Sequence, residues 1–343
     1  MILRSRNGWE YQFIPMTLGG IKLGTINEVL KQARLMRAKG RYKPALKYVR
    51  SMLEEWPDEP DLHLLAAELH YRLHHKSSAL RACKRAARLR PHWPVALVLM
   101  GDLVKREGDR KKSEWVLSAL RSGVEVYPED RRIQFSIAQL LRELGRPNEA
   151  IVALRQVIKL DADLEAHKML AELESEVGRH DEAKKHALIV LEGDPHNLIA
   201  LELLAFINLQ LGDLDQALQA MTRIVHIVPT DPFSRFKLAT LYHQRGAYHQ
   251  AMVEYDLTVE LSDQTHLAQE AQEAIEGLDR LQLQQVLTIS ADDPLFRAKL
   301  SHDPAKAVVQ RGFHLTEASL EILRGTDFSA IPFSPRRGGT SVS

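Results

Sequence analysis

Small residues recur along this chain at a nearly constant spacing, with helical character on both sides of a turn. The first set is spaced by 34, 34, 37, 33, 34 and 34 residues and consists of Ala33, Ala67, Gly101, Ala138, Ala171, Ala205 and Ala239. A turn residue lies seven positions after each member, at Gly40, His74, Gly108, Gly145, Gly178, Gly212 and Gly246. A second small residue follows at Ala45, Ala79, Ser113, Ala150, Ala183, Ala217 and Ala251. This period predicts an all-α solenoid of helix-turn-helix units.

Each column of the repeat has a physical reason. Small residues are needed where two helices cross closely, because larger side chains would push the backbones apart. Glycine suits the turn because it adopts left-handed backbone angles without a steric penalty. A fourth column of prolines stands where the second helix must end, at Pro57, Pro91, Pro128, Pro195 and Pro229.

These columns resemble the tetratricopeptide repeat (TPR), whose pattern has a small residue at position 8, alanine at 20, an apolar residue at 24 and proline at 32. In that register seven repeats cover residues 26–263 and begin at Ile26, Pro60, Pro94, Arg131, Leu164, Leu198 and Pro232. The tryptophan that the family often has at position 4 is absent, and the tyrosine of position 11 occurs only as Tyr242. Three extra residues between Ser113 and Pro128 predict a longer second helix or a wider loop in the third repeat.

The segments outside the repeats have a different character. Residues 1–25 contain several glycines and a proline, which predicts an irregular extension, either loose or formed by short extended strands. Residues 264–291 contain an amphipathic stretch, His266 to Leu287, and are expected to form a helix that caps the array. Residues 332–343 are polar and rich in proline and glycine, which predicts a disordered tail.

Residues 292–331 are predicted to form a small helical module, because two Asp-Pro pairs are typical helix starts. The segment resembles the small helical module of the minor subunit of extradiol ring-opening dioxygenases, and leader segments of some peptide precursors. The resemblance rests on Asp293, Pro294, Phe296, Leu300, Asp303, Pro304, Ala307, Gly312, Leu315, Thr316, Leu320, Gly325 and Asp327. It implies docking or recognition, since the dioxygenase chemistry resides in a separate large subunit. A plain three-helix terminal cap is the alternative.

Composition places the chain among ordinary soluble proteins. It has 343 residues, 45% of them apolar and 27% charged, and no apolar run approaches the roughly 18 residues of a membrane span. We find no signal peptide, and the single cysteine, Cys83, fits a reducing compartment, so we expect a cytoplasmic protein without membrane contact. Cys83 occupies an apolar repeat position and is expected to be a buried structural thiol.

The net charge is only +1, but the charges are unevenly distributed. Residues 72–112 hold twelve Lys or Arg against three acids, whereas residues 253–293 hold ten acids against one arginine. These runs are either solvated helix faces or, at the basic end, a site for an anionic partner. The candidate basic patch consists of Arg81, Lys84, Arg85, Arg88, Lys111 and Lys112. Nucleic acid is disfavoured there because only Trp93 and Trp115 offer stacking surfaces.

No motif in the chain predicts catalysis. Phosphate loops, dinucleotide fingerprints and nucleophile elbows are absent from the sequence. The best metal candidate is the histidine group His63, His70, His74 and His75, but no cysteine or carboxylate cluster completes it. The sequence therefore predicts no catalytic residue, metal site or cofactor, and it assigns no oligomeric state.

The resemblance to TPR proteins implies a concave groove lined by positions 2, 5, 9 and 12 of each first helix. These positions are mixed and charged in the first five repeats, as at Arg34, Arg37, Asp61 and Glu68. In the last two repeats five of eight are large and apolar, which predicts a peptide groove formed by Ile199, Glu202, Phe206, Leu209, Phe233, Phe236, Thr240 and His243. Phe328, Ile331 and Phe333 are a candidate pseudo-ligand that folds back into this groove.

We therefore expect a non-catalytic scaffold or adaptor that binds a protein or peptide in the groove. One alternative is an accessory subunit or leader-bearing partner of a biosynthetic or ring-opening enzyme, recognised through residues 292–331. Another is a binder of nucleic acid or an acidic partner through the basic second and third repeats.

Overall fold

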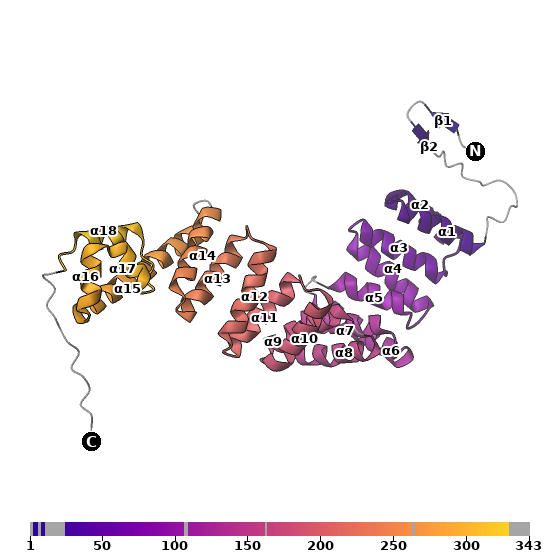
Figure 1. Cartoon of the computed structure of the whole chain (residues 1–343). Coiled ribbons are helices and arrows are strands. Elements are labelled where there is room, and N and C mark those ends of the chain that lie inside the picture. The colour runs from indigo at the N-terminus through magenta and orange to yellow at the C-terminus, as the bar shows by residue number, and fades with distance from the viewer. Residues whose placement is uncertain are drawn as a thin grey trace, which may run out of the picture. The chain divides into compact units, whose positions relative to one another are not determined.

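The computed structural model describes residues 3–5, 8–10, 25–105, 109–161, 163–262 and 265–328 (Figure 1). The chain divides into two compact units, residues 1–144 and 145–343. Most of the described residues of both units lie in repeat helices, as the sequence predicts. None of the described helices is both long enough and apolar enough to cross a membrane.

The first unit holds two short strands and seven helices in its described part. Strand β1 pairs antiparallel with β2, with Arg4 opposite Trp9. The elements are β1 (Leu3–Ser5), β2 (Gly8–Glu10), α1 (Ile26–Ala38), α2 (Tyr42–Glu55), α3 (Pro60–Arg72), α4 (Lys76–Leu89), α5 (Pro94–Val104), α6 (Arg110–Val126) and α7 (Arg131–Glu143).

The second unit continues the repeats and adds the C-terminal helices. Its repeat helices are α8 (Pro147–Leu160), α9 (Leu164–Glu176), α10 (His180–Gly193), α11 (Leu198–Gln210), α12 (Leu214–Ile227), α13 (Pro232–Arg245) and α14 (Tyr248–Leu261). The remaining helices are α15 (His266–Asp292), α16 (Pro294–His302), α17 (Pro304–Gln310) and α18 (Glu317–Gly325).

The small residues of the repeat lie in the helix crossings. Every residue of both columns is buried, and Ala33, Ala67, Ala138 and Ala239 have no exposed surface. Gly101 also lies at a close contact with the next repeat, since a β-carbon there would lie 2.3 Å from the Ser136 Oγ of α7. The spacing of small residues in the sequence thus marks the contacts that hold each helix pair together.

The turns of the repeat have the left-handed backbone that their glycines predict. Gly40, Gly145, Gly178, Gly212 and Gly246 have φ angles of 70° to 78°. In the second repeat His74 takes the same conformation, with a φ of 60°. Gly108 of the third repeat lies outside the described residues. The extra residues of that repeat lengthen the second helix, because α6 has 17 residues where α4 and α8 have 14.

Helices α15 to α18 share one hydrophobic core. Val286 of α15 packs with Phe296 and Leu300 of α16, Val308 of α17 and Leu323 of α18, and each of these side chains is at least 98% buried. The C-terminal helices are therefore built on the long α15 helix and complete its apolar face.

Phe328 belongs to this same core and is only 3% exposed. The expectation that it folds into the groove of the sixth and seventh repeats is wrong, because its side chain already fills a site among the terminal helices. Ile331 and Phe333, the other members of that candidate segment, lie outside the described residues, as does the tail at 332–343.

A buried carboxylate joins α15 to the start of α18. Asp279, 6% exposed, accepts hydrogen bonds from the Thr316 backbone N–H at 2.7 Å, the Thr316 Oγ1 at 2.7 Å and the Ser319 Oγ at 2.6 Å. Three residues further along α15, the buried Gln282 side-chain amide donates to the His314 carbonyl at 3.0 Å and accepts from the His314 N–H at 2.9 Å. These contacts satisfy backbone groups that precede a helix and would otherwise be unpaired.

Candidate functional site

An exposed apolar surface lies on the first helices of the sixth and seventh repeats, α11 and α13. We call it the α11/α13 surface, and its members are the eight residues predicted to line the groove, Ile199, Glu202, Phe206, Leu209, Phe233, Phe236, Thr240 and His243. Ile199 is 48% exposed, Phe206 49% and Phe233 62%, and Leu209 is also exposed. Side chains of this size are normally buried, so their exposure on neighbouring repeats marks a surface suited to a partner.

One ion pair joins the two helices at this surface. Lys237 of α13 contacts Glu202 of α11, with 3.1 Å between the ammonium nitrogen and a carboxylate oxygen. Both side chains are about half exposed, so the pair contributes little stability. It shows that long side chains of α11 and α13 reach one another, and Glu202 is the one acidic member of the surface.

Three members of the surface are held by the second helix of the seventh repeat. The Phe236 ring packs edge-on against Tyr255 of α14, with 5.4 Å between ring centroids. The Thr240 hydroxyl donates to the Phe236 carbonyl at 2.9 Å and lies 3.3 Å from the Tyr255 hydroxyl. The exposed His243 ring lies edge-on to Tyr248, at 6.1 Å. Phe236 is thus partly in the core, and Phe206 and Phe233 are the more accessible aromatic side chains.

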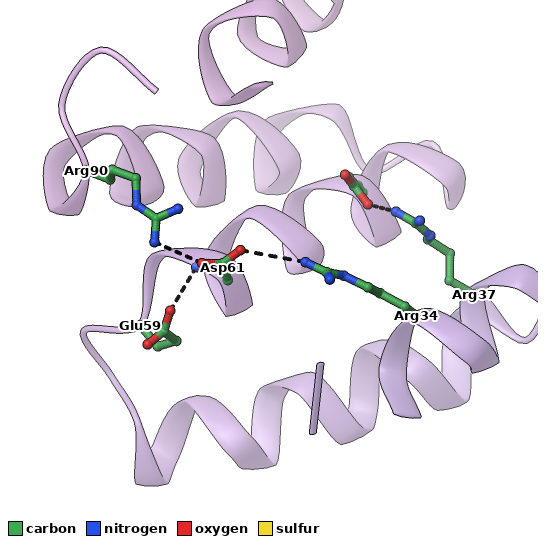
Figure 2. Close-up of polar contacts among 6 residues, drawn as sticks. Arg34, Arg37, Glu59, Asp61 and Arg90 are labelled. Atoms are coloured by element: carbon green, nitrogen blue, oxygen red, sulfur yellow. Dashed lines mark hydrogen bonds and ion pairs between the residues drawn. The ribbon is translucent and has the colours of Figure 1, made fainter. Parts of the chain in front are cut away.

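Four of the eight corresponding positions of the first two repeats hold charged side chains that pair across the helices (Figure 2). Asp61 at the start of α3 lies 3.6 Å from the Arg34 guanidinium of α1 and 3.0 Å from that of Arg90. Arg37 of α1 pairs in the same way with Glu68 of α3. Opposite charges on adjacent first helices compensate one another here, whereas α11 and α13 present mainly hydrocarbon.

A polar network around the buried Glu174 joins the fourth and fifth repeats and was not predicted from the sequence. Glu174 of α9 has no exposed surface and contacts Arg155 of α8 at 2.8 Å and His186 of α10 at 3.5 Å. The His186 Nδ1 lies 2.8 Å from the His167 Nδ1. Burial lowers the pKa of both histidines, and for His186 the nearby Glu174 opposes part of that effect. The four side chains of this network lie on three different helices. Their positions in the sequence form no local motif, so sequence reasoning could not find the network.

The predicted basic patch lies on two helices of the first unit. Arg81, Lys84, Arg85 and Arg88 are on α4, and Lys111 and Lys112 are on α6. Arg85 pairs with Asp58 at 2.6 Å, and Lys112 with Asp109 at 3.1 Å. The Lys84 ammonium of α4 lies 4.3 Å from the centroid of the Trp115 ring of α6. Side chains of the two helices therefore meet at this point.

The histidine group of the second repeat is spread over a helix and a turn. The rings of His70 and His75 are 5.8 Å apart, while the His63 Nε2 contacts the Pro57 carbonyl at 2.7 Å. Over the residues that the structure describes, no three His, Cys, Asp or Glu side chains are placed to share a metal ion. Cys83 is fully buried, and burial raises the pKa of its thiol to about 12, so it is a structural residue as predicted.

The repeats are confirmed by comparison with known proteins. Tetratricopeptide repeat family models match residues 30–93, 132–164 and 168–232. The TPR repeat-containing protein YpiA of Bacillus subtilis (strain 168) is 22% identical over 225 residues, which is 64% of this chain and 52% of YpiA. The chain thus spans about half the length of that relative.

Solved structures support the same fold. The C-terminal part of a TPR repeat-containing protein from Cytophaga hutchinsonii has a TM-score of 0.60 at 14% identity, covering 71% of this chain and 98% of that structure. PilW, a type IV pilus biogenesis factor, has a TM-score of 0.51 at 14% identity, covering 62% of this chain and 97% of PilW. Identity this low shows the fold alone. The resemblance drawn for residues 292–331 stays a prediction.

Proposed function

Because this chain carries tetratricopeptide repeats, we propose that it is a non-catalytic adaptor that binds a segment of another protein on the α11/α13 surface. The observation that carries the proposal is the exposure of Ile199, Phe206, Leu209 and Phe233 on the first helices of two successive repeats. Tetratricopeptide repeats generally act as protein-interaction scaffolds, and their stacked helices offer extended surfaces rather than enclosed reaction sites.

The chemistry of the surface suggests the chemistry of its partner. Two exposed phenylalanine rings favour a helical or extended segment with large apolar side chains, since burial of such groups dominates peptide recognition. The Glu202–Lys237 ion pair and the exposed His243 favour polar groups between those anchors. Burial of the two rings is expected to contribute most of the affinity.

The test compares two double variants of the full chain. Phe206→Ser/Phe233→Ser removes the two accessible rings, whereas Val152→Ser/Leu188→Ser removes two comparably exposed apolar side chains from the second helices α8 and α10. Each protein is used to capture partners from cells that express it naturally. Circular dichroism verifies that both variants retain the helical fold.

We expect the partner to bind the wild type and the Val152/Leu188 variant alike. We expect it to bind the Phe206/Phe233 variant at least about tenfold more weakly, because truncation of one interface hot spot costs about 2 kcal/mol or more and about 1.4 kcal/mol is tenfold. Isothermal titration with the captured partner provides that number. Equal affinity for all three proteins would refute the proposed site.

A further inference from the structure

The first unit contains a pocket of about 370 Å³ between the second helices of two successive repeats, α4 and α6. Its floor is apolar and includes Leu97 and Met100 of α5, both at least 97% buried. The pocket stays open between the helices because the side chains that line it there are small. They are Ala87 on α4 and Ala119 and Ser122 on α6. This volume lies within the range of specific ligand sites and is ample for one large side chain.

The rim of the pocket is aromatic and cationic. Trp115 is 45% exposed and forms one wall, with the Lys84 ammonium over its ring. Arg88 lies on the same face of α4 as Lys84, one turn further along. In the described part of the chain neither Lys84 nor Arg88 forms an ion pair, in contrast to Arg85 and Lys112 beside them.

We propose that this pocket binds an acidic peptide segment of a partner protein, with one large apolar side chain inserted against Trp115 and flanking carboxylates at Lys84 and Arg88. An unpaired cation beside an apolar cavity favours a ligand that supplies both hydrocarbon and negative charge. The site lies in the first unit and is independent of the α11/α13 surface.

Two other occupants fit the pocket less well. The chain's own terminal segments have the wrong charge, because residues 1–24 carry Arg4, Arg6 and Lys22 against one acid, and residues 329–343 carry two arginines and no acid. A nucleic-acid strand needs successive stacking platforms and a row of open cations. Here Arg85 and Lys112 are already engaged by carboxylates, which leaves no continuous row of open cations.

The test uses seven-residue peptides and the full chain. The probe has a central phenylalanine flanked on each side by three Asp or Glu residues. One control replaces the phenylalanine with alanine, a second replaces the acids with their amides, and a third ligand is an oligothymidylate of eight nucleotides. Binding is followed by NMR through the indole N–H of Trp115, which the Trp115→Phe variant assigns among the four tryptophans.

We expect the acidic phenylalanine peptide to shift the Trp115 signal and to bind at least about tenfold more tightly than either peptide control. The Lys84→Gln/Arg88→Gln variant is expected to weaken binding about tenfold. The matched variant Arg85→Gln/Lys112→Gln, with the same charge change on paired cations, is expected to weaken it less than about threefold. The proposal is overturned if the alanine peptide binds equally well, if the oligonucleotide binds more tightly, or if the Trp115 signal does not move.

Discussion

At the scale of single residues, the repeat tolerates one exception at its most demanding position. Five of the six described turns use glycine at a positive φ, and His74 alone supplies a side chain there. An L-residue in this region has its β-carbon close to the following carbonyl, which costs roughly 1 to 2 kcal/mol. The histidine therefore carries strain that its glycine counterparts avoid.

The substitution His74→Gly is expected to raise the free energy of unfolding by about 0.5 to 1 kcal/mol, since relief of strain exceeds the added entropy of the unfolded chain. The matched variant His75→Gly changes the neighbouring residue, whose φ is −88°, and is expected to lower stability. Urea denaturation of both variants measures the difference. The strain argument fails if both substitutions destabilise the protein.

The buried histidines make the fifth repeat sensitive to acid. Burial holds the pKa of His167 and of His186 below the usual value of about 6.5, and their facing Nδ1 atoms have room for one proton between them. As the pH falls, the unfolded chain therefore binds protons at these histidines before the native state does. The native state keeps its full stability relative to the unfolded chain above about pH 6.5, and it loses stability as the pH falls through that value toward the native pKa.

We expect hydrogen exchange of the α9 and α10 amides to show a loss of protection between pH 7 and pH 5. His167→Gln is expected to reduce that loss, because it removes one of the two titrating groups. His226→Gln, which removes an exposed histidine on α12, is expected to leave the loss unchanged. Identical pH profiles for the wild type and His167→Gln would contradict the assignment.

At the scale of elements, helices are joined by contacts that the repeat does not describe. The clearest case is the attachment of α18 to α15 through Asp279, because a single carboxylate accepts three hydrogen bonds from residues 37 and 40 positions later. Charge-assisted hydrogen bonds of this kind are stronger than neutral ones. The C-terminal helices thus depend on α15 for polar contacts as well as for their core.

The substitution Asp279→Ala is expected to destabilise the packing of α16 to α18 by about 2 to 4 kcal/mol, because it leaves the Thr316 and Ser319 donors unpaired. Hydrogen exchange of those helices and limited proteolysis measure the effect. Glu273→Ala removes an exposed acid from the same helix and serves as the control. Unchanged protection of α18 in the Asp279 variant would mean that the apolar core alone holds the helices.

At the scale of the whole molecule, stability is expected to be local, because each helix pair of a repeat array contacts only its neighbours. The two compact units, residues 1–144 and 145–343, agree with this expectation. Their surfaces also differ in chemistry. The first unit has a basic patch beside a pocket, and the second has the exposed apolar α11/α13 surface.

Overpacking one crossing tests this locality. Ala205 is 4% exposed within the core formed by α11 and α12, so Ala205→Trp is expected to cost about 1 to 3 kcal/mol. Hydrogen exchange should show weaker protection in α11 to α14 and unchanged protection in α1 to α5. Gln210→Trp, at an exposed position on α11, is expected to change neither region. Equal loss in both units would show that the array unfolds as one cooperative block.

The sequence by itself determined the repeat, its turns and its buried small residues. These features are predictable because each column reflects a local requirement, such as a left-handed turn at Gly212 or a close helix crossing at Ala205. The resemblance to TPR proteins pointed to the apolar positions of α11 and α13, which helical spacing places on a shared face of each helix.

The tertiary structure alone decided which side chains meet across repeats. The pairing of Lys84 with Trp115, the burial of Glu174 beside His186 and the inclusion of Phe328 in the terminal core all join residues of different helices. A period of 34 residues specifies where the backbone of each repeat lies, but it does not specify which long side chains contact one another across repeats. The apolar surface was therefore visible in the sequence, whereas the cationic pocket appeared only when α4, α5 and α6 were placed together.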